Sequence, residues 1–180
     1  QNWEQKAAIT ARAAALVGEV QVIALDYVST SQMMALELRE RFRNLSVVTN
    51  SIQNALILAE NPGITIILTG GILNRDEYTL VNDFSSTLES IHIDIMFMTV
   101  TGIDPAIGCT DQRLSEIRIQ NQMHRCASRT IVLADSSKFG KASLLKICPF
   151  DEVDTIVTDS GISPELESRI RETGANLIIT

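Results

Sequence analysis

The sequence predicts an α/β fold with an open, mostly parallel sheet and helices on both of its faces. Three observations lead to this prediction. Short, continuous apolar runs rich in Val and Ile recur along the chain, as is typical of strands buried on both faces of a parallel sheet. Amphipathic segments with helical spacing separate these runs. Cap and turn residues lie between the two kinds of segment, which favours repeated βαβ units.

The expected elements alternate along the whole chain. Strands are predicted at residues 20–25, 45–48, 65–68, 93–100, 130–134, 154–158 and 176–179. A helix is predicted over 30–43, because Met34, Leu38 and Phe42 fall four residues apart and share one face. A similar apolar spacing predicts a helix over 51–60. Ser163-Pro164 is typical of a helix start and Gly174 of a helix end.

Composition limits the class of protein. The 180 residues are 45% hydrophobic and 21% charged, which predicts a single globular domain spanning 1–180. No apolar run reaches the roughly 18 residues of a membrane span, so no membrane partner is expected. The net charge of −7 argues against nucleic-acid binding by this chain, because phosphate contacts need clustered Lys and Arg.

The cysteines and histidines show no metal-site spacing. Cys109, Cys126 and Cys148 form no Cys-x-x-Cys pair, and His92 and His124 have no ligand partner at helical spacing. The cysteines are interpreted as small core residues in a reducing compartment, which predicts a cytoplasmic protein. Neither a metal nor a cofactor is expected.

Polar and small residues follow five successive strands. In open α/β sheets, ligands gather beyond the carboxyl ends of the strands. Helix starts, hydroxyls and one lysine at the same edge favour a site for a phosphate and a polyol. The candidate ligand-binding residues at these ends are Asp26, Ser29, Thr30, Asn50, Ser51, Gly70, Gly71, Thr101, Gly102, Asp104 and Lys138.

Each candidate also has a purely structural explanation. Ser29, Thr30 and Ser51 are good helix N-caps with or without a ligand. Gly70-Gly71 suits a tight turn. At any single strand end the structural explanation is favoured, and the convergence of five ends favours a binding site.

The order of these motifs resembles a known family. "LDYVSTS" (25–31), "VVTNS" (47–51), "ILTGG" (67–71), "LADSSKFG" (133–140) and "DTIVTD" (154–159) resemble the C-terminal effector domain of DeoR-type bacterial transcription repressors, the glycerol-3-phosphate repressor group. The resemblance covers almost the whole chain. It implies the fold of ribose-5-phosphate isomerase and the CoA transferases, and a DNA-binding winged helix-turn-helix domain that precedes this chain. It also implies a pocket for a phosphorylated sugar or sugar derivative that modulates DNA binding by the full-length protein.

The resemblance also implies roles for single residues. Phosphate would be held by the Ser29-Thr30 turn and by Lys138, and sugar hydroxyls by Asp26, Asn50 and Asp104. The remaining matches are the family's Asn-Ser pair at Ser51, its double glycine at Gly70-Gly71, the glycine of its Asp-Gly-Ile-Asp motif at Gly102, and a helix glutamate at Glu116.

Several positions depart from the family pattern, and Asn82-Asp83 and Gln120 are among them. Val28 replaces the glycine of the first turn, and Thr101 replaces the first Asp of the Asp-Gly-Ile-Asp motif. A β-branched residue disfavours positive φ and crowds a ligand that approaches the backbone. The pocket is therefore expected to be smaller, or different in specificity, from that of the family.

Two alternatives to a sensor domain stay open. An isomerase-like enzyme would use Glu116 as a base and Lys138 to hold phosphate. The isomerases also carry an acid at the position of Thr101 and a lysine in the 106–108 loop, and both are absent, so no catalytic residue and no enzyme activity are predicted. The other alternative is an oligomerisation module that has lost its ligand. A homodimer or homotetramer is expected for both the sensor domain and the oligomerisation module, since operator symmetry mirrors protein symmetry.

Overall fold

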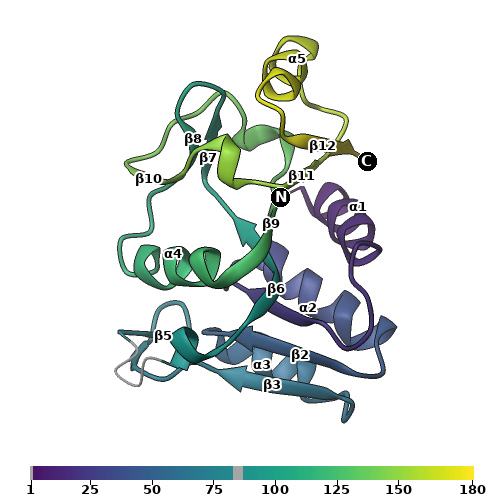
Figure 1. The fold of residues 1–180 in the computed structure, drawn as a ribbon, viewed down its shortest axis with the longest axis vertical. Helices are drawn as coiled ribbons and strands as arrows, with labels where there is room; N and C mark the ends of the chain where they lie inside the picture. The colour runs from purple at the N-terminus through teal and green to yellow at the C-terminus, as the bar shows by residue number, and fades with distance from the viewer. Residues whose placement is uncertain (1, 83–86) are drawn as a thin grey trace.

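A seven-stranded sheet forms the centre of the protein in a computed structural model that describes residues 2–82 and 87–180 (Figure 1). Every neighbouring pair of its strands is parallel. The seven strands that the sequence predicts are the seven strands of this sheet, with ends shifted by a few residues. They are β1 (Val22–Leu25), β2 (Leu45–Thr49), β3 (Ile64–Leu68), β6 (Ile93–Thr99), β9 (Ala127–Leu133), β11 (Thr155–Thr158) and β12 (Asn176–Ile179).

The strand order places a switch point beside β1. The order across the sheet is β12-β11-β9-β6-β1-β2-β3. The chain adds β2 and β3 on one side of β1 and then returns to lay β6 on the other side, where Leu25 pairs with Phe97. Ligands of open α/β sheets bind where the strand order reverses in this way. The loops that follow β1 and β6 are therefore the place to look for a site.

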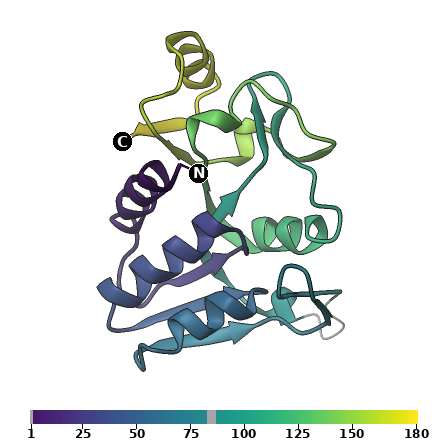
Figure 2. The ribbon, with the colours of Figure 1, turned by 180° about the vertical axis from the view of Figure 1, so that it is seen from behind.

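Helices cover both faces of the sheet, as the sequence predicts. The first face carries α1 (Trp3–Ala14), α2 (Ser29–Arg41) and α3 (Ile52–Leu58), and Figure 2 shows these three in front. The opposite face carries α4 (Ile117–Cys126), and α5 (Pro164–Glu172) packs beside β12. None of the helices in 2–82 and 87–180 has the length and apolarity that crossing a membrane requires.

Alternation along the strands fills two cores. Leu25 lies with Leu38 of α2 in the core under the first face, whereas its neighbour Ala24 lies with Met123 of α4 in the other. Successive side chains of a strand point to opposite faces. Strands covered on both sides therefore need apolar residues at nearly every position, which is why they were visible in the sequence.

Five short strands were not predicted. The hairpin β4 (Ile72–Asn74) and β5 (Thr79–Val81) is antiparallel, as is the three-stranded sheet of β10 (Leu145–Cys148), β8 (Gly108–Asp111) and β7 (Gly102–Asp104). Each has only three or four residues, so no apolar run forms. Three 3-10 turns complete the described elements, η1 (Thr87–Ser90), η2 (Ser136–Lys138) and η3 (Phe150–Glu152).

The buried face of α2 gives a test of the first core. Met34, Leu38 and Phe42, which the sequence places on one face, are all buried. Leu38 is 0% exposed, whereas Leu36 of the same helix is 40% exposed. We expect Leu38→Ala to lower the free energy of unfolding by about 2–5 kcal/mol, because it leaves a cavity in a close-packed core. Leu36→Ala is the matched control, with an expected change of about 0.5 kcal/mol. Urea denaturation measures both, and equal effects would contradict this account of the core.

Candidate functional site

A cavity of about 120 Å³ opens at the switch point, and we name it the strand-end cavity. Its walls come from α1, the start of α2, the end of β6, the loop between β8 and α4, and the segment after β9. Elements far apart in the sequence thus meet at one edge of the sheet. The lining residues are Lys6, Val28, Ser29, Thr30, Thr99, Val100, Thr101, Arg113, Leu133, Ala134, Asp135 and Lys138.

The start of α2 forms one wall of the strand-end cavity. The helix begins at Ser29, with Val28 at the N-cap position and no side-chain cap. Ser29 and Thr30 are therefore not N-caps, contrary to one prediction, and both of them line the cavity. Backbone N–H groups in the first turn of a helix have no intrahelical acceptor and favour anions.

Val28 is less disruptive than the sequence suggested. Its φ of −72° and ψ of 172° are ordinary extended values. The turn does not need a positive φ, so the valine is unstrained there, and its effect on the size or specificity of the pocket stays a prediction. The half-buried side chain still lines the cavity, so its effect is on the space for a ligand.

Two lysines from different elements line the strand-end cavity. Lys6 of α1 donates to the hydroxyl of Ser29 over 2.9 Å, and Lys138 lies at the end of η2. Neither lysine forms an ion pair with any residue in the described part of the chain. The acidic residue of this wall, Asp135, accepts from the backbone N–H and hydroxyl of Ser137. The cavity therefore presents two lysines without an ion-pair partner beside a helix start, together with the carboxylate of Asp135.

Asp26 lies behind the cavity and does not line it. Its carboxylate accepts hydrogen bonds from the hydroxyl of Ser31, and from the backbone N–H and hydroxyl of Thr99 at 2.7 and 2.6 Å. Burial raises the pKa of Asp26, while the charge of Arg113 and these hydrogen bonds oppose the shift. The group joins the start of α2 to the end of β6.

Asn50 and Glu116 belong to a second cluster of buried polar residues. The side-chain amide of Asn50 donates to Glu116 over 2.7 Å, and the hydroxyl of Thr79 donates to its other carboxylate oxygen over 2.5 Å. Ser51 caps α3 by accepting from the backbone N–H of Asn54. These residues do not line the strand-end cavity. The structural explanation of Ser51 is confirmed.

The remaining predicted residues shape loops. Gly71 has φ +129°, and a Cβ there would lie 2.2 Å from the carbonyl oxygen of Val81. At Gly102 a Cβ would lie 2.7 Å from the carbonyl oxygen of Lys141. The carboxylate of Asp104 accepts from two backbone N–H groups of its own turn. Gly70 lies outside the cavity lining as well, whereas Thr101 lines it.

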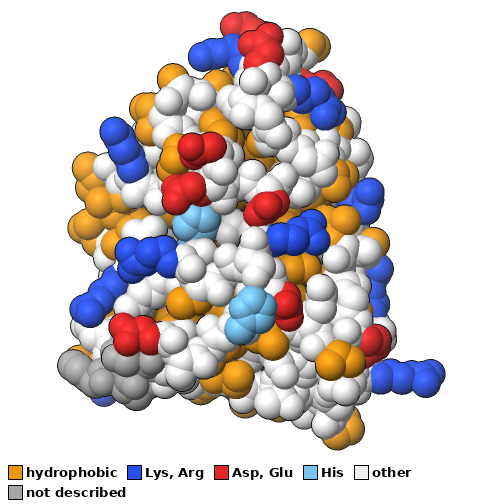
Figure 3. Space-filling view, viewed as in Figure 1, with side chains coloured by type: hydrophobic (Ala, Val, Ile, Leu, Met, Phe, Trp, Pro, Cys, Tyr) orange, Lys and Arg blue, Asp and Glu red, His pale blue; other side chains and the backbone are white. Residues whose placement is uncertain are grey.

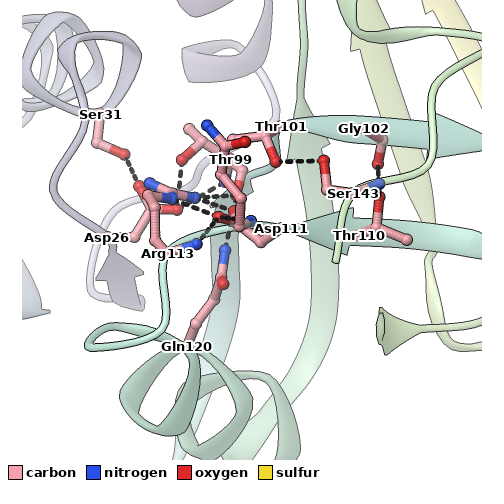
Figure 4. Close-up of polar contacts among 11 residues, drawn as sticks. Asp26, Ser31, Thr99, Thr101, Gly102, Thr110, Asp111, Arg113, Gln120 and Ser143 are labelled. Carbon is pink, nitrogen blue, oxygen red and sulfur yellow. Dashed lines mark hydrogen bonds and ion pairs between the residues drawn. The ribbon is translucent and has the colours of Figure 1, made fainter. Parts of the chain in front are cut away.

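Arg113 was missed by the sequence analysis, and it is the most connected side chain of the site (Figure 4). It forms an ion pair with buried Asp111, with 2.6 Å between Nε and Oδ1. Its Nη2 donates to the backbone carbonyl of Thr99 over 3.0 Å, and its guanidinium lies 5.1 Å from the ring centroid of Tyr27. Burial alone would lower the pKa of Arg113, but the hydrogen bond to Asp111 and the nearby carboxylates raise it.

The missed residues had weak sequence signals. Arg113 lies in a loop and Lys6 lies in α1, and neither follows a strand of the main sheet. The strand-end rule therefore could not find them. The pair Asp111-x-Arg113 ahead of a helix is the only local hint that the described residues offer.

A larger cavity of about 530 Å³ adjoins the first one. The two share Val28, Ser29, Thr101 and Arg113. We name it the tyrosine cavity, and it is also lined by Tyr27, Gln32, Gln53, Asp76, Glu77, Tyr78 and Gln112. Amide, hydroxyl and carboxylate side chains beside aromatic rings suit a polyhydroxylated molecule.

Comparison with known proteins identifies relatives of this chain. The family model described as the DeoR C-terminal sensor domain matches residues 1–160. The chain is 34% identical over 174 residues to the HTH-type transcriptional regulator GolR of Listeria innocua serovar 6a, covering 96% of this chain and 68% of GolR. It is 30% identical over 179 residues to the HTH-type transcriptional regulator GlpR of Haloferax volcanii, covering 99% of this chain and 69% of GlpR.

A solved structure shows the same fold. A D-ribose-5-phosphate isomerase in complex with phospho-erythronic acid has a TM-score of 0.57 at 20% identity, covering 76% of this chain and 53% of the isomerase. The fold predicted by resemblance is confirmed. At this identity the similarity concerns the fold alone.

The carboxylate of Asp159 gives a pH test of the wall that carries Lys138. It accepts from the backbone N–H groups of Ser136 and Gly161 at 2.7 and 2.9 Å. Burial alone would raise the pKa of Asp159, but these hydrogen bonds lower it below its usual 3.8. A lowered folded-state pKa adds stability above the unfolded pKa, and this stability is lost as the pH falls through the folded value.

We therefore expect Asp159→Asn to destabilise the protein at neutral pH, with a difference from the wild type that shrinks as the pH falls below about 3.8. Urea denaturation across this pH range measures the difference. Asp151→Asn, at an exposed carboxylate of η3, is the matched control and should leave the stability unchanged at neutral pH. A difference between Asp159→Asn and the wild type that is independent of pH would contradict the role of the charge.

Proposed function

Since this chain belongs to the DeoR family of transcriptional regulators, as its C-terminal sensor domain, we propose that its strand-end cavity binds the phosphate of a phosphorylated sugar or polyol. The adjoining tyrosine cavity would hold the rest of the ligand. Binding would change the affinity of the full-length protein for DNA.

One observation carries this proposal. Lys6, Lys138 and the first turn of α2 converge on a single small cavity, and neither lysine has an ion-pair partner among the described residues. A phosphate group matches this arrangement, because it can accept from a helix start and from several cations together. The isomerase of the same fold was solved with phospho-erythronic acid, which shares with the proposed ligands a phosphate on a hydroxylated carbon chain.

The proposed mechanism requires parts beyond this chain. The chain spans about two thirds of the length of GolR and GlpR. We propose that a winged helix-turn-helix domain precedes it and makes the DNA contacts, in a cytoplasmic homodimer or homotetramer. Figure 3 supports the proposal that another domain makes the DNA contacts. On the face of the chain that it shows, the described Lys and Arg side chains are spread among Asp and Glu side chains and form no basic patch. Ligand binding would favour one arrangement of the oligomer and so alter the affinity for the operator.

The site gives less support to an isomerase. Both carboxylate oxygens of Glu116 accept hydrogen bonds from protein groups, Asn50 and Thr79. A base must reach the proton that it removes, and Glu116 lines neither the strand-end cavity nor the tyrosine cavity. The relatives are also named as transcriptional regulators. We propose that the domain is a sensor without catalytic residues.

Binding measurements test this proposal. We expect ribose 5-phosphate or glycerol 3-phosphate at millimolar concentration to raise the melting temperature, since a ligand at 100 times its Kd adds about 2.7 kcal/mol of stability.

The two lysines give a second test. We expect Lys138→Ala and Lys6→Ala to weaken binding of inorganic phosphate, ribose 5-phosphate and glycerol 3-phosphate about tenfold or more in calorimetry, because each substitution removes a charge-assisted hydrogen bond.

The control is Lys141→Ala, which removes an exposed lysine three positions from Lys138 and outside the cavity lining. It should leave all three affinities unchanged. If no phosphosugar or phosphopolyol stabilises the protein, the oligomerisation module replaces the sensor. If Lys138→Ala weakens ribose and ribose 5-phosphate equally, the phosphate does not lie at Lys138.

A further inference from the structure

The guanidinium of Arg113 is fixed before any ligand arrives. Asp111 accepts from its Nε and Nη2, the carbonyl of Thr99 accepts from Nη2, and the ring of Tyr27 lies against its face. Its side chain is only 14% exposed. A side chain held in this way loses little further conformational entropy when it makes one more contact.

One donor of this fixed group is unused. The Nη1 atom of Arg113 is buried and has no hydrogen-bond partner in residues 2–82 and 87–180. A buried donor without a partner costs free energy, and such groups are rare in folded proteins. Arg113 also lines both the strand-end cavity and the tyrosine cavity. A ligand acceptor that enters beside the Arg113 guanidinium would satisfy Nη1.

We propose that Arg113 is a specificity-determining residue, which donates from Nη1 to an oxygen of the ligand beyond its phosphate. This inference rests on the proposed function, in which the phosphate lies between Lys6 and Lys138. Tyr27 and Asp111 act as positioning residues, because they hold the guanidinium and leave Nη1 as its unpaired nitrogen.

The surrounding charges indicate which kind of ligand oxygen Arg113 contacts. Asp111 already balances the charge of Arg113, and Asp76 and Glu77 line the tyrosine cavity. A second phosphate or a carboxylate on the ligand would meet these acids and be repelled, whereas hydroxyl groups can donate to them. Arg113 therefore selects a hydroxyl, ring or carbonyl oxygen of a singly phosphorylated and otherwise uncharged compound.

Arg113→Lys tests this role. Lysine keeps a cation beside Asp111 but lacks the planar fork that places Nη1. We expect the affinity for ribose 5-phosphate to fall about tenfold or more in calorimetry, while the affinity for inorganic phosphate stays unchanged. Arg118→Lys, at an exposed arginine of α4 outside both cavities, is the matched control and should change neither affinity. Wild-type protein should bind ribulose 1,5-bisphosphate more weakly than ribose 5-phosphate.

A measurement on the wild-type protein covers the case in which Arg113→Lys does not fold. In NMR spectra of arginine side chains, the Arg113 N–H signals should shift with ribose 5-phosphate and stay in place with inorganic phosphate. Signals that move equally with both compounds, or with neither, overturn the proposal, as does an Arg113→Lys variant that binds both like the wild type. If the wild-type protein binds neither compound, the ligand function itself is wrong and the role of Arg113 falls with it.

Discussion

The buried carboxylate of Asp26 is the interaction on which the geometry of the site depends. It accepts from Ser31 in the first turn of α2 and from Thr99 at the end of β6, and these elements flank the switch point of the sheet. Burying a carboxyl group is costly unless donors satisfy it, so its partners must stay in place. Asp26 thereby fixes the direction of α2, and the first turn of this helix opens into the strand-end cavity.

Thr99 extends this constraint to the opposite face of the sheet. Its carbonyl oxygen accepts from Arg113 over 3.0 Å and from the side-chain amide of Gln120 of α4 over 2.6 Å. Residues of α2, β6, the β8–α4 loop and α4 therefore share one hydrogen-bonded network, as Figure 4 shows around Thr99. Networks of buried polar groups are costly when any one of them is left unpaired.

The sequence predicted the main sheet well because its strands are covered on both faces and so read as apolar runs. It missed β7 and β8, whose few residues mix glycine and polar side chains, and β10, whose apolar residues are interrupted by Lys146. The strand-end rule found Ser29, Thr30, Thr101 and Lys138 in the cavity lining. It could not separate them from Asp26 and Asn50, because all follow strands and only three-dimensional packing decides which side chains pair with each other. Lys6 and Arg113 come from elements to which the rule does not apply.

A ligand can shift an equilibrium only if it binds two states with different affinity. In the present structure Lys6 donates to Ser29, so a phosphate that recruits Lys6 has to compete with this bond. The ligand would then bridge α1 and α2 in place of the hydrogen bond between Lys6 and Ser29. The cores beneath both helices are fully buried and apolar, at Ile9 and Leu38 among others, and close packing resists large displacements. Any signal from the strand-end cavity along α1 is therefore a small adjustment of that helix, which only a larger assembly could amplify.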